Sequence, residues 1–184
     1  MTFSTHASFL TKSRLVAGLG GLLLSAALQA QTLVERDREF LEQATQNVRA
    51  DLSASRLALQ KTRNPQVRAF AQHMLDERSR THEEIQALAR TKQVELPQEL
   101  SILQQGTEMV MERLNDERFD RRYVNRIGIE AREDQFDLFD RASREAQDTD
   151  VKALANRMLP ALRSQLEAAR NLGAWLDATN RLPR

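Results

Sequence analysis

The sequence predicts an all-α protein: a four-helix bundle with a short helix in the crossover between its second and third long helices. The chain has 184 residues, about the length of one domain. It contains only 6 glycines and 4 prolines, so few positions interrupt a helix, and its apolar residues recur at three- and four-residue spacing. With 41% hydrophobic and 29% charged residues, it has enough apolar side chains for a packed core and too many for a disordered chain.

The N-terminal segment 1–30 is predicted to be a secretory signal peptide. Lys12 and Arg14 precede an apolar run over 15–28, and Ala30 offers a small residue for cleavage before Gln31. An uncleaved membrane anchor is the alternative, but a helix over 15–28 reaches only about 21 Å, short of the ~30 Å hydrocarbon core of a bilayer. We therefore expect a periplasmic or otherwise exported protein.

Composition excludes several classes of function. The chain has no cysteine, so disulfide frameworks, iron–sulfur centres, zinc-thiolate sites and cysteine nucleophiles are excluded. Cleavage after Ala30 would remove Lys12 and Arg14 from the 27 basic residues, leaving 25 against 26 acidic residues. The mature chain then lacks the basic excess of a nucleic-acid-binding protein, and no later stretch is apolar enough to be a transmembrane span.

The first two long helices are predicted over residues 36–62 and 65–92. Phe40, Ala44 and Val48 begin the apolar stripe of the first, which ends at Asn64-Pro65. Proline is tolerated in the first turn of the second helix, because its missing N–H would be unpaired there. The short link makes these two helices a hairpin.

The second half of the chain predicts a crossover and another hairpin. The connection between the hairpins is too long for a turn, and we expect a short helix within it. Such a crossover lets the second and third long helices run parallel. The predicted elements are a short helix over 98–114, long helices over 116–146 and 150–178, and a bundle domain over 31–180. Pro160 lies inside the last helix and is expected to kink it.

One polar residue interrupts the inward face of each long helix, and all four residues lie near mid-height. They are Asp51, Arg78, Arg132 and Gln165. We expect them to meet in one buried polar layer, with Glu77 and Glu130 as acidic neighbours. The alternative is a shifted seam, in which Arg78 and Arg132 extend outward to solvent along their apolar stems.

Several segments resemble a known family, the ferritin-like domain of unknown function 4142, found in exported bacterial proteins often labelled membrane or outer-membrane proteins. The segments are DREFLEQA at 37–44, NPQVRAFAQHML at 64–75, ELP at 95–97, RFDRRYV at 118–124 and MLPALRSQLEAARNL at 158–172. The resemblance covers about residues 37–173. It implies a ferritin-like four-helix bundle, in line with the crossover topology.

The resemblance also implies what this chain lacks. In the family, the positions matching Arg78, Arg132 and Gln165 are typically histidine, and the position matching Asp51 is typically glutamate. A guanidinium group has no lone pair for a metal, and its charge repels a cation. We therefore expect no metal site and no cofactor, and an ion-pair layer of Asp51 with the two arginines and Gln165 instead.

The sequence leads to three functional hypotheses. The first is an exported, noncatalytic ferritin-like bundle that serves in binding, scaffolding or envelope stress protection, without a catalytic residue. The second is a metal-binding or metal-storing protein that uses the carboxylates of Asp51, Glu77 and Glu130. In a third, the chain binds a partner, either an envelope protein or a second copy of itself, and dimerises through Met109, Val110 and Met111 of the crossover helix.

Overall fold

The structure is a computed structural model that describes residues 33–181, and all the regular secondary structure within this range is helical. The predicted signal peptide over 1–30 lies outside the described residues. The helices are α1 (Glu35–Lys61), α2 (Pro65–Lys92), α3 (Ile102–Glu112), α4 (Asp116–Tyr123), the π-helix η1 (Val124–Glu130), α5 (Ala131–Glu145) and α6 (Thr149–Arg181). None of these helices is both long and apolar enough to cross a membrane.

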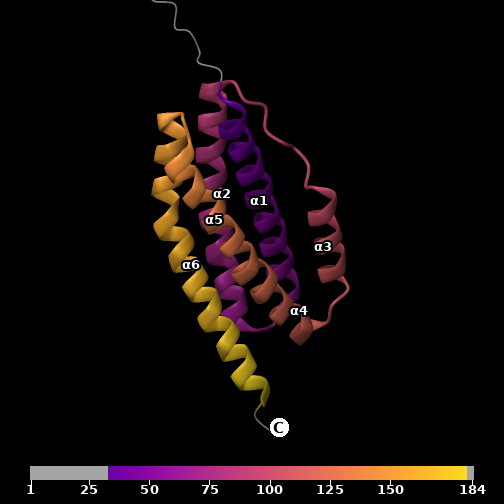
Figure 1. The fold of residues 1–184 in the computed structure, drawn as a ribbon. Helices are drawn as coiled ribbons and strands as arrows, with labels where there is room; N and C mark the ends of the chain where they lie inside the picture. The colour runs from indigo at the N-terminus through magenta and orange to yellow at the C-terminus, as the bar shows by residue number, and fades with distance from the viewer. Residues whose placement is uncertain (1–32, 182–184) are drawn as a thin grey trace, which may run out of the picture.

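The long helices pack side by side as two hairpins (Figure 1). Helix α1 packs along α2, and α5 packs along α6; contacts of α1 with α5 and of α2 with α6 join the two pairs. The segment 93–101 and α3 run back along the outside of α1 (Figure 1). As a result, α2 runs parallel to the continuous helix formed by α4, η1 and α5. The long crossover therefore lets the second and third long helices run parallel, as its length predicted.

Local signals set the ends of the helices. The side chain of Asn64 accepts hydrogen bonds from the amides of Gln66 (2.9 Å) and Val67 (3.3 Å), which caps α2. The crossover helix begins at Ile102 rather than near residue 98, because Ser101 and Gln104 form a capping box that fixes its first turn. Helix α6 continues through Pro160 as one helix and runs three residues beyond the predicted end, to Arg181.

The predicted third long helix contains a π-helical segment that the sequence pattern did not indicate. Helices α4, η1 and α5 follow one another without a break, and residues Val124–Glu130 form the π segment. Gly128 lies in it against α6; a Cβ added at Gly128 would stand 2.9 Å from the Cβ of Ala169. The missing side chain therefore lets this segment approach α6 closely.

The core consists of two apolar clusters that follow one another along α1, which starts at the upper end of the molecule in Figure 1; we call them the upper and the lower cluster. The upper cluster contains Phe40, Leu41, Ala44, Val48, Leu52, Ile85, Leu138, Phe139, Ala142, Ala146, Val151, Leu154, Ala155 and Leu162. The lower cluster contains Ala54, Ala58, Val67, Phe70, Ala71, Met74, Met111, Phe119, Tyr123, Val124, Ile127, Ala169 and Leu176. Aromatic pairs stabilise both clusters, Phe40 with Phe139 at 5.0 Å between ring centroids and Phe119 with Tyr123 at 6.1 Å.

Polar contacts join the helix ends at the top of the molecule. The buried carboxylate of Asp37 accepts hydrogen bonds from the amides of Gln147 (3.0 Å) and Asp148 (2.7 Å), which fastens the start of α1 to the α5–α6 turn. The ammonium group of Lys92 lies 2.7 Å from carboxylate oxygens of both Asp148 and Asp150. These contacts hold α2 against the start of α6.

Candidate functional site

The structure buries all four polar residues that the sequence placed in the layer. The exposed fractions are 1% for Asp51, 2% for Arg78, 0% for Arg132 and 3% for Gln165. The alternative in which the two arginines extend to solvent is therefore wrong. Each of the four comes from a different long helix, namely α1, α2, α5 and α6.

The layer lies between the two apolar clusters. In α1, Asp51 is adjacent to Leu52 of the upper cluster and three residues before Ala54 of the lower cluster. In α6, Leu162 of the upper cluster precedes Gln165, and Ala169 of the lower cluster follows it. The polar groups thus interrupt an otherwise apolar interior at mid-height.

Asp51, Arg132 and Gln135 form a closed triangle. The carboxylate of Asp51 pairs with the guanidinium Nη2 of Arg132, and its Oδ2 also accepts a 3.0 Å hydrogen bond from Nε2 of Gln135. Arg132 Nη1 donates to Oε1 of Gln135 at 2.9 Å. The Nε of Arg132 donates to the carbonyl of Ile127 at 3.3 Å, which anchors the guanidinium to the π segment.

Arg78 joins the layer through amides rather than through Asp51. Its guanidinium donates from Nη2 to Oε1 of Gln165 and, at 3.5 Å, from Nη1 to Oε1 of Gln135. Gln165 Nε2 donates in turn to the carboxylate of Glu77, which lies at the half-buried edge of the layer. The sequence predicted Asp51 as the partner of both arginines, but it contacts Arg132, and Gln135 connects it to Arg78.

Gln135 is the central residue that sequence reasoning missed. It lies one turn after Arg132, and residues three apart share a helix face. A primary amide is both donor and acceptor, so Gln135 can donate to a carboxylate while it accepts from two guanidinium groups. The three-residue spacing from Arg132 is the signal in the sequence that points to Gln135.

Glu130 does not take part in the layer, which corrects its assignment as an acidic neighbour. It is exposed and forms a 2.8 Å ion pair with Arg126 on the surface. Residues two apart on a helix point to different sides, so Glu130 cannot face inward together with Arg132. Glu77 does adjoin the layer, and it also lies 3.5 Å from the ring of His73 at the surface.

The layer holds two guanidinium cations near two carboxylates. Burial, followed by the like charge of Arg132, lowers the pKa of Arg78 to about 10, while the charges of Asp51 and Glu77 oppose this shift. Arg78 is therefore still a cation at neutral pH. The arrangement fixes charges in place, and neither guanidinium offers a lone pair to a metal.

A second buried polar pair lies just below the layer. The hydroxyl groups of Ser55 and Tyr123 are 2.9 Å apart and share a hydrogen bond. Burial raises the pKa of Tyr123, although the hydrogen bond with Ser55 opposes the shift. This tyrosine therefore stays protonated and links α1 to the end of α4.

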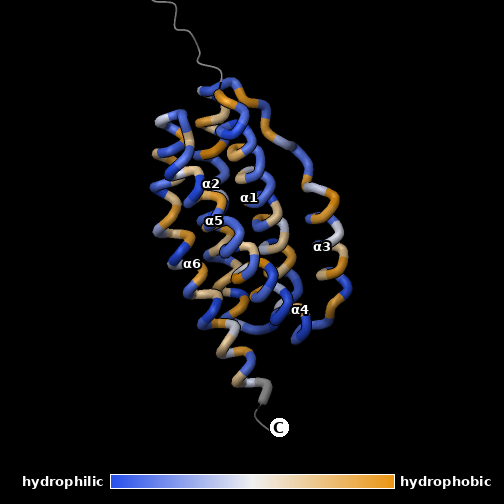
Figure 2. The backbone as a smooth tube through the Cα atoms, viewed as in Figure 1, coloured by the Kyte–Doolittle hydropathy of each residue, from blue (hydrophilic) through white to orange (hydrophobic). Residues whose placement is uncertain are grey.

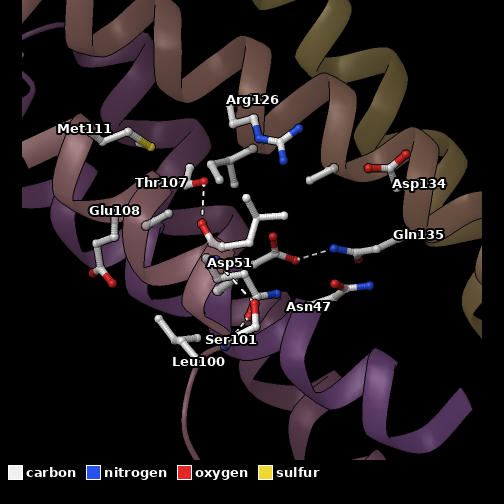
Figure 3. A pocket seen from close by; sticks show the side chains of 16 residues that line it. Asn47, Asp51, Leu100, Ser101, Thr107, Glu108, Met111, Arg126, Asp134 and Gln135 are labelled. Carbon is white, nitrogen blue, oxygen red and sulfur yellow. Dashed lines mark hydrogen bonds between the residues drawn. The ribbon is translucent and has the colours of Figure 1, made fainter. Parts of the chain in front are cut away.

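A cleft of about 210 Å³ opens beside the layer, between α1, α3, η1 and α5 (Figure 3). Asp51 and Gln135 lie side by side in its wall, joined by their hydrogen bond. Thr107 and Met111 line the side formed by α3, and Arg126 comes from η1. The cleft thus lies against the Asp51 edge of the layer, although Asp51 and Gln135 are themselves buried.

The donor set does not fit a metal ion. Residues 33–181 contain no group of three histidine, aspartate or glutamate side chains placed to hold one. Where the family resemblance puts imidazoles, the layer has two guanidinium groups and an amide, and Asp51 is already bound by Arg132 and Gln135.

Comparisons with known proteins agree with the fold. A crystal structure of a DUF305 fragment from Deinococcus radiodurans is similar, with a TM-score of 0.69 and 14% sequence identity over 77% of this chain and 98% of that one. At this identity the likeness concerns the fold alone. None of the curated proteins compared with the chain matches it. The domain of unknown function DUF4142 matches residues 23–172, most of the sequence, and the chain therefore belongs to the DUF4142 family.

Proposed function

We propose that this protein is an exported, noncatalytic ferritin-like four-helix bundle that binds or scaffolds other molecules in the cell envelope, including during envelope stress. Its interior carries an ion-pair layer instead of a metal site. The observation that supports this most directly is the burial of both guanidinium groups, those of Arg78 and Arg132, at the centre of the bundle. A metal ion there would meet two cations and no imidazole.

The layer is suited to a structural role. An ion pair with Arg132 and a hydrogen bond from Gln135 hold Asp51, and amide oxygens hold Arg78, so most of the polar groups have partners. A buried network of this kind need not add stability, because removing charges from water costs several kcal/mol per ion. It selects one register of the four helices, since a shift of any one would leave a charge without a partner.

The carboxylate-based metal site finds no support in the arrangement of its three candidate ligands. Asp51 is bound within the layer, Glu77 accepts from Gln165, and Glu130 pairs with Arg126 on the surface. These carboxylates do not converge on one point.

The cleft supports the binding part of the proposal. It is open to the outside, its wall is largely apolar, and it ends at the carboxylate of Asp51 and the amide of Gln135. A concave apolar surface with a few polar groups is the usual form of a small-ligand site.

Metal analysis of the protein purified from the periplasm, without a histidine tag, tests the proposal. We expect no stoichiometric iron, manganese or zinc. One equivalent of any of these, retained through dialysis, would overturn it.

The matched variant is Arg78→His with Arg132→His and Gln165→His, which puts imidazoles at the family positions. It is expected to bind a transition metal and to melt at a higher temperature when zinc is added, whereas the natural protein should show neither effect.

A further inference from the structure

Helix α3 turns its apolar face away from its own bundle. Ile102 and Leu103 are 89% and 74% exposed, and Met109 and Val110 are 58% and 54% exposed. A surface helix of a monomeric protein normally points such a face inward. Figure 2 shows these hydrophobic segments on α3, at the side of the molecule.

The inner face of α3 is fixed to the bundle, so its orientation is well determined. Met111 inserts into the lower cluster, and Glu108 accepts a hydrogen bond from Ser53 of α1. At its C-terminal end, the carbonyl of Glu112 accepts a 2.8 Å hydrogen bond from Lys61. Because these contacts fix the rotation of α3, Ile102, Met109 and Val110 remain outside, while Leu103 is exposed and also lines the cleft between α3 and α1.

The exposed face is symmetric about Gly106. Ile102 and Leu103 stand four and three residues before it, and Met109 and Val110 stand three and four residues after it. When two such helices pack antiparallel with their Gly106 residues at the crossing point, Ile102 faces Val110 of the second copy and Leu103 faces its Met109. No heavy atom lies within 4 Å of a Cβ added at Gly106, so the centre of this face is open for close approach.

Exposed charges flank α3 with the same spacing. Glu99 lies in the segment before the helix, seven residues before Gly106, and Arg113 follows the helix, seven residues after Gly106. An antiparallel pair brings each glutamate to the arginine of the other copy, whereas a parallel pair would bring like charges together. The pattern therefore favours a second copy in the antiparallel orientation.

We propose that the protein forms a two-fold symmetric dimer in which the outer faces of two α3 helices pack antiparallel, crossing at Gly106. One helix per copy makes a small interface, so the affinity is modest, with a Kd on the order of 10 µM. Of the apolar segment named from the sequence, Met109 and Val110 lie in this interface, and Met111 does not, because it is buried in the lower cluster.

Sedimentation velocity of the exported chain from about 1 µM to about 1 mM tests this dimer. The natural protein is expected to pass from monomer to dimer over this range. Ile102→Glu is expected to stay monomeric with an unchanged melting curve, since Ile102 is 89% exposed in the single copy and does not line the cleft. The proposal is overturned if the natural protein stays monomeric throughout, or if the Ile102→Glu variant still dimerises.

Charge exchange tests the orientation. Glu99→Arg and Arg113→Glu should each weaken self-association about tenfold, because each places like charges together at both ends of the interface. A mixture of the two single variants, and the double variant alone, should restore dimerisation. Unchanged association of both single variants would contradict the antiparallel arrangement. A monomer that instead binds phospholipid vesicles, and loses this binding in Ile102→Glu, would overturn the dimer and show that a membrane surface covers the face.

Discussion

At the scale of single residues, Asp51 brings a negative charge into contact with Arg132 and Gln135 deep inside the bundle. Asp51→Ala would leave the Arg132 guanidinium buried without its carboxylate. We expect a loss of about 3–5 kcal/mol in the free energy of unfolding, measured by urea denaturation. The matched control is Asp137→Ala on the exposed side of α5, which should change stability by less than about 0.5 kcal/mol.

The same experiment separates the ion pair from the packing around it. Arg132→Met alone would leave Asp51 unpaired, whereas Asp51→Ala combined with Arg132→Met removes both charges. The double variant should therefore cost less than the two single losses added together. If Asp51→Ala unfolds at the same urea concentration as Asp137→Ala, the layer contributes nothing to folding.

Spacing along the helices was enough to predict the four helix-borne members of the layer, but not how they pair. Asp51, Arg78, Arg132 and Gln165 each interrupt an apolar stripe, which is visible in the sequence. Which carboxylate meets which guanidinium depends on side-chain rotamers and on the rotation of each helix. These come from packing, and no periodicity encodes them.

At the scale of elements, the two glycines of η1 and α3 have opposite surroundings. A Cβ at Gly128 would stand 2.9 Å from the Cβ of Ala169, and neither atom has a flexible chain to move away. Gly128→Ala should therefore destabilise the protein by about 1–3 kcal/mol. Gly106→Ala meets nothing within 4 Å and removes a flexible residue from a helix, so it should stabilise the isolated copy by up to about 1 kcal/mol.

Thermal denaturation at low protein concentration, where dimers do not contribute, compares the two variants. Gly128→Ala with Ala169→Gly restores the space between η1 and α6, and should recover part of the loss. A Gly128→Ala variant as stable as the natural protein would show that the close approach of these helices is not required.

Predicting the elements from the sequence succeeded for regular helices and failed where the backbone departs from them. The two hairpins were predicted from the apolar spacing and from the helix boundaries at Asn64-Pro65 and Asp148. The π-helix η1 was not predicted, because a short widened segment barely changes the apolar pattern of a helix. Gly128 was the only residue in the pattern that pointed to it. Residues two apart on a helix point to different sides, so treating Met109 to Met111 as a single surface was wrong: Met111 is buried while Met109 is exposed.

At the scale of the whole molecule, the contacts of Lys92 link stability to pH. Burial tends to raise the pKa of Asp148, but hydrogen bonds from Lys92 and from the amides of Val151 and Asp150 lower it overall. Hydrogen bonds to Asp148 and Asp150 raise the pKa of Lys92. The Asp148 carboxylate therefore stabilises the protein at pH values above its unfolded pKa, and this stabilisation is lost as pH falls through its folded pKa. The Lys92 ammonium stabilises the protein at pH values below its unfolded pKa, and this stabilisation is lost as pH rises through its folded pKa.

Lys92→Met should consequently lower stability at pH 7, by up to about 1 kcal/mol, and make little difference at pH 2, where the carboxylates are protonated. Urea denaturation of both proteins at the two pH values measures this. A difference between the proteins that is the same at pH 2 and pH 7 would mean that Lys92 acts through its methylene groups rather than its charge. Lys152→Met, at a half-buried position in the first turns of α6, controls for the loss of a lysine.

The position of α1 relative to the predicted cleavage site gives a test of export. The signal-peptide pattern puts cleavage between Ala30 and Gln31, and α1 begins at Glu35, after Leu33 has already packed against the upper cluster. Cleavage there would remove no residue of the core. We therefore expect mass spectrometry of the periplasmic protein to give a chain that starts at Gln31.

Signal peptidases require a small residue before the cut, so Ala30→Arg should leave an unprocessed precursor at the membrane, whereas Gln31→Ser should be processed normally. Processed protein from Ala30→Arg, or natural protein that remains in the cytoplasm, would contradict export by this segment.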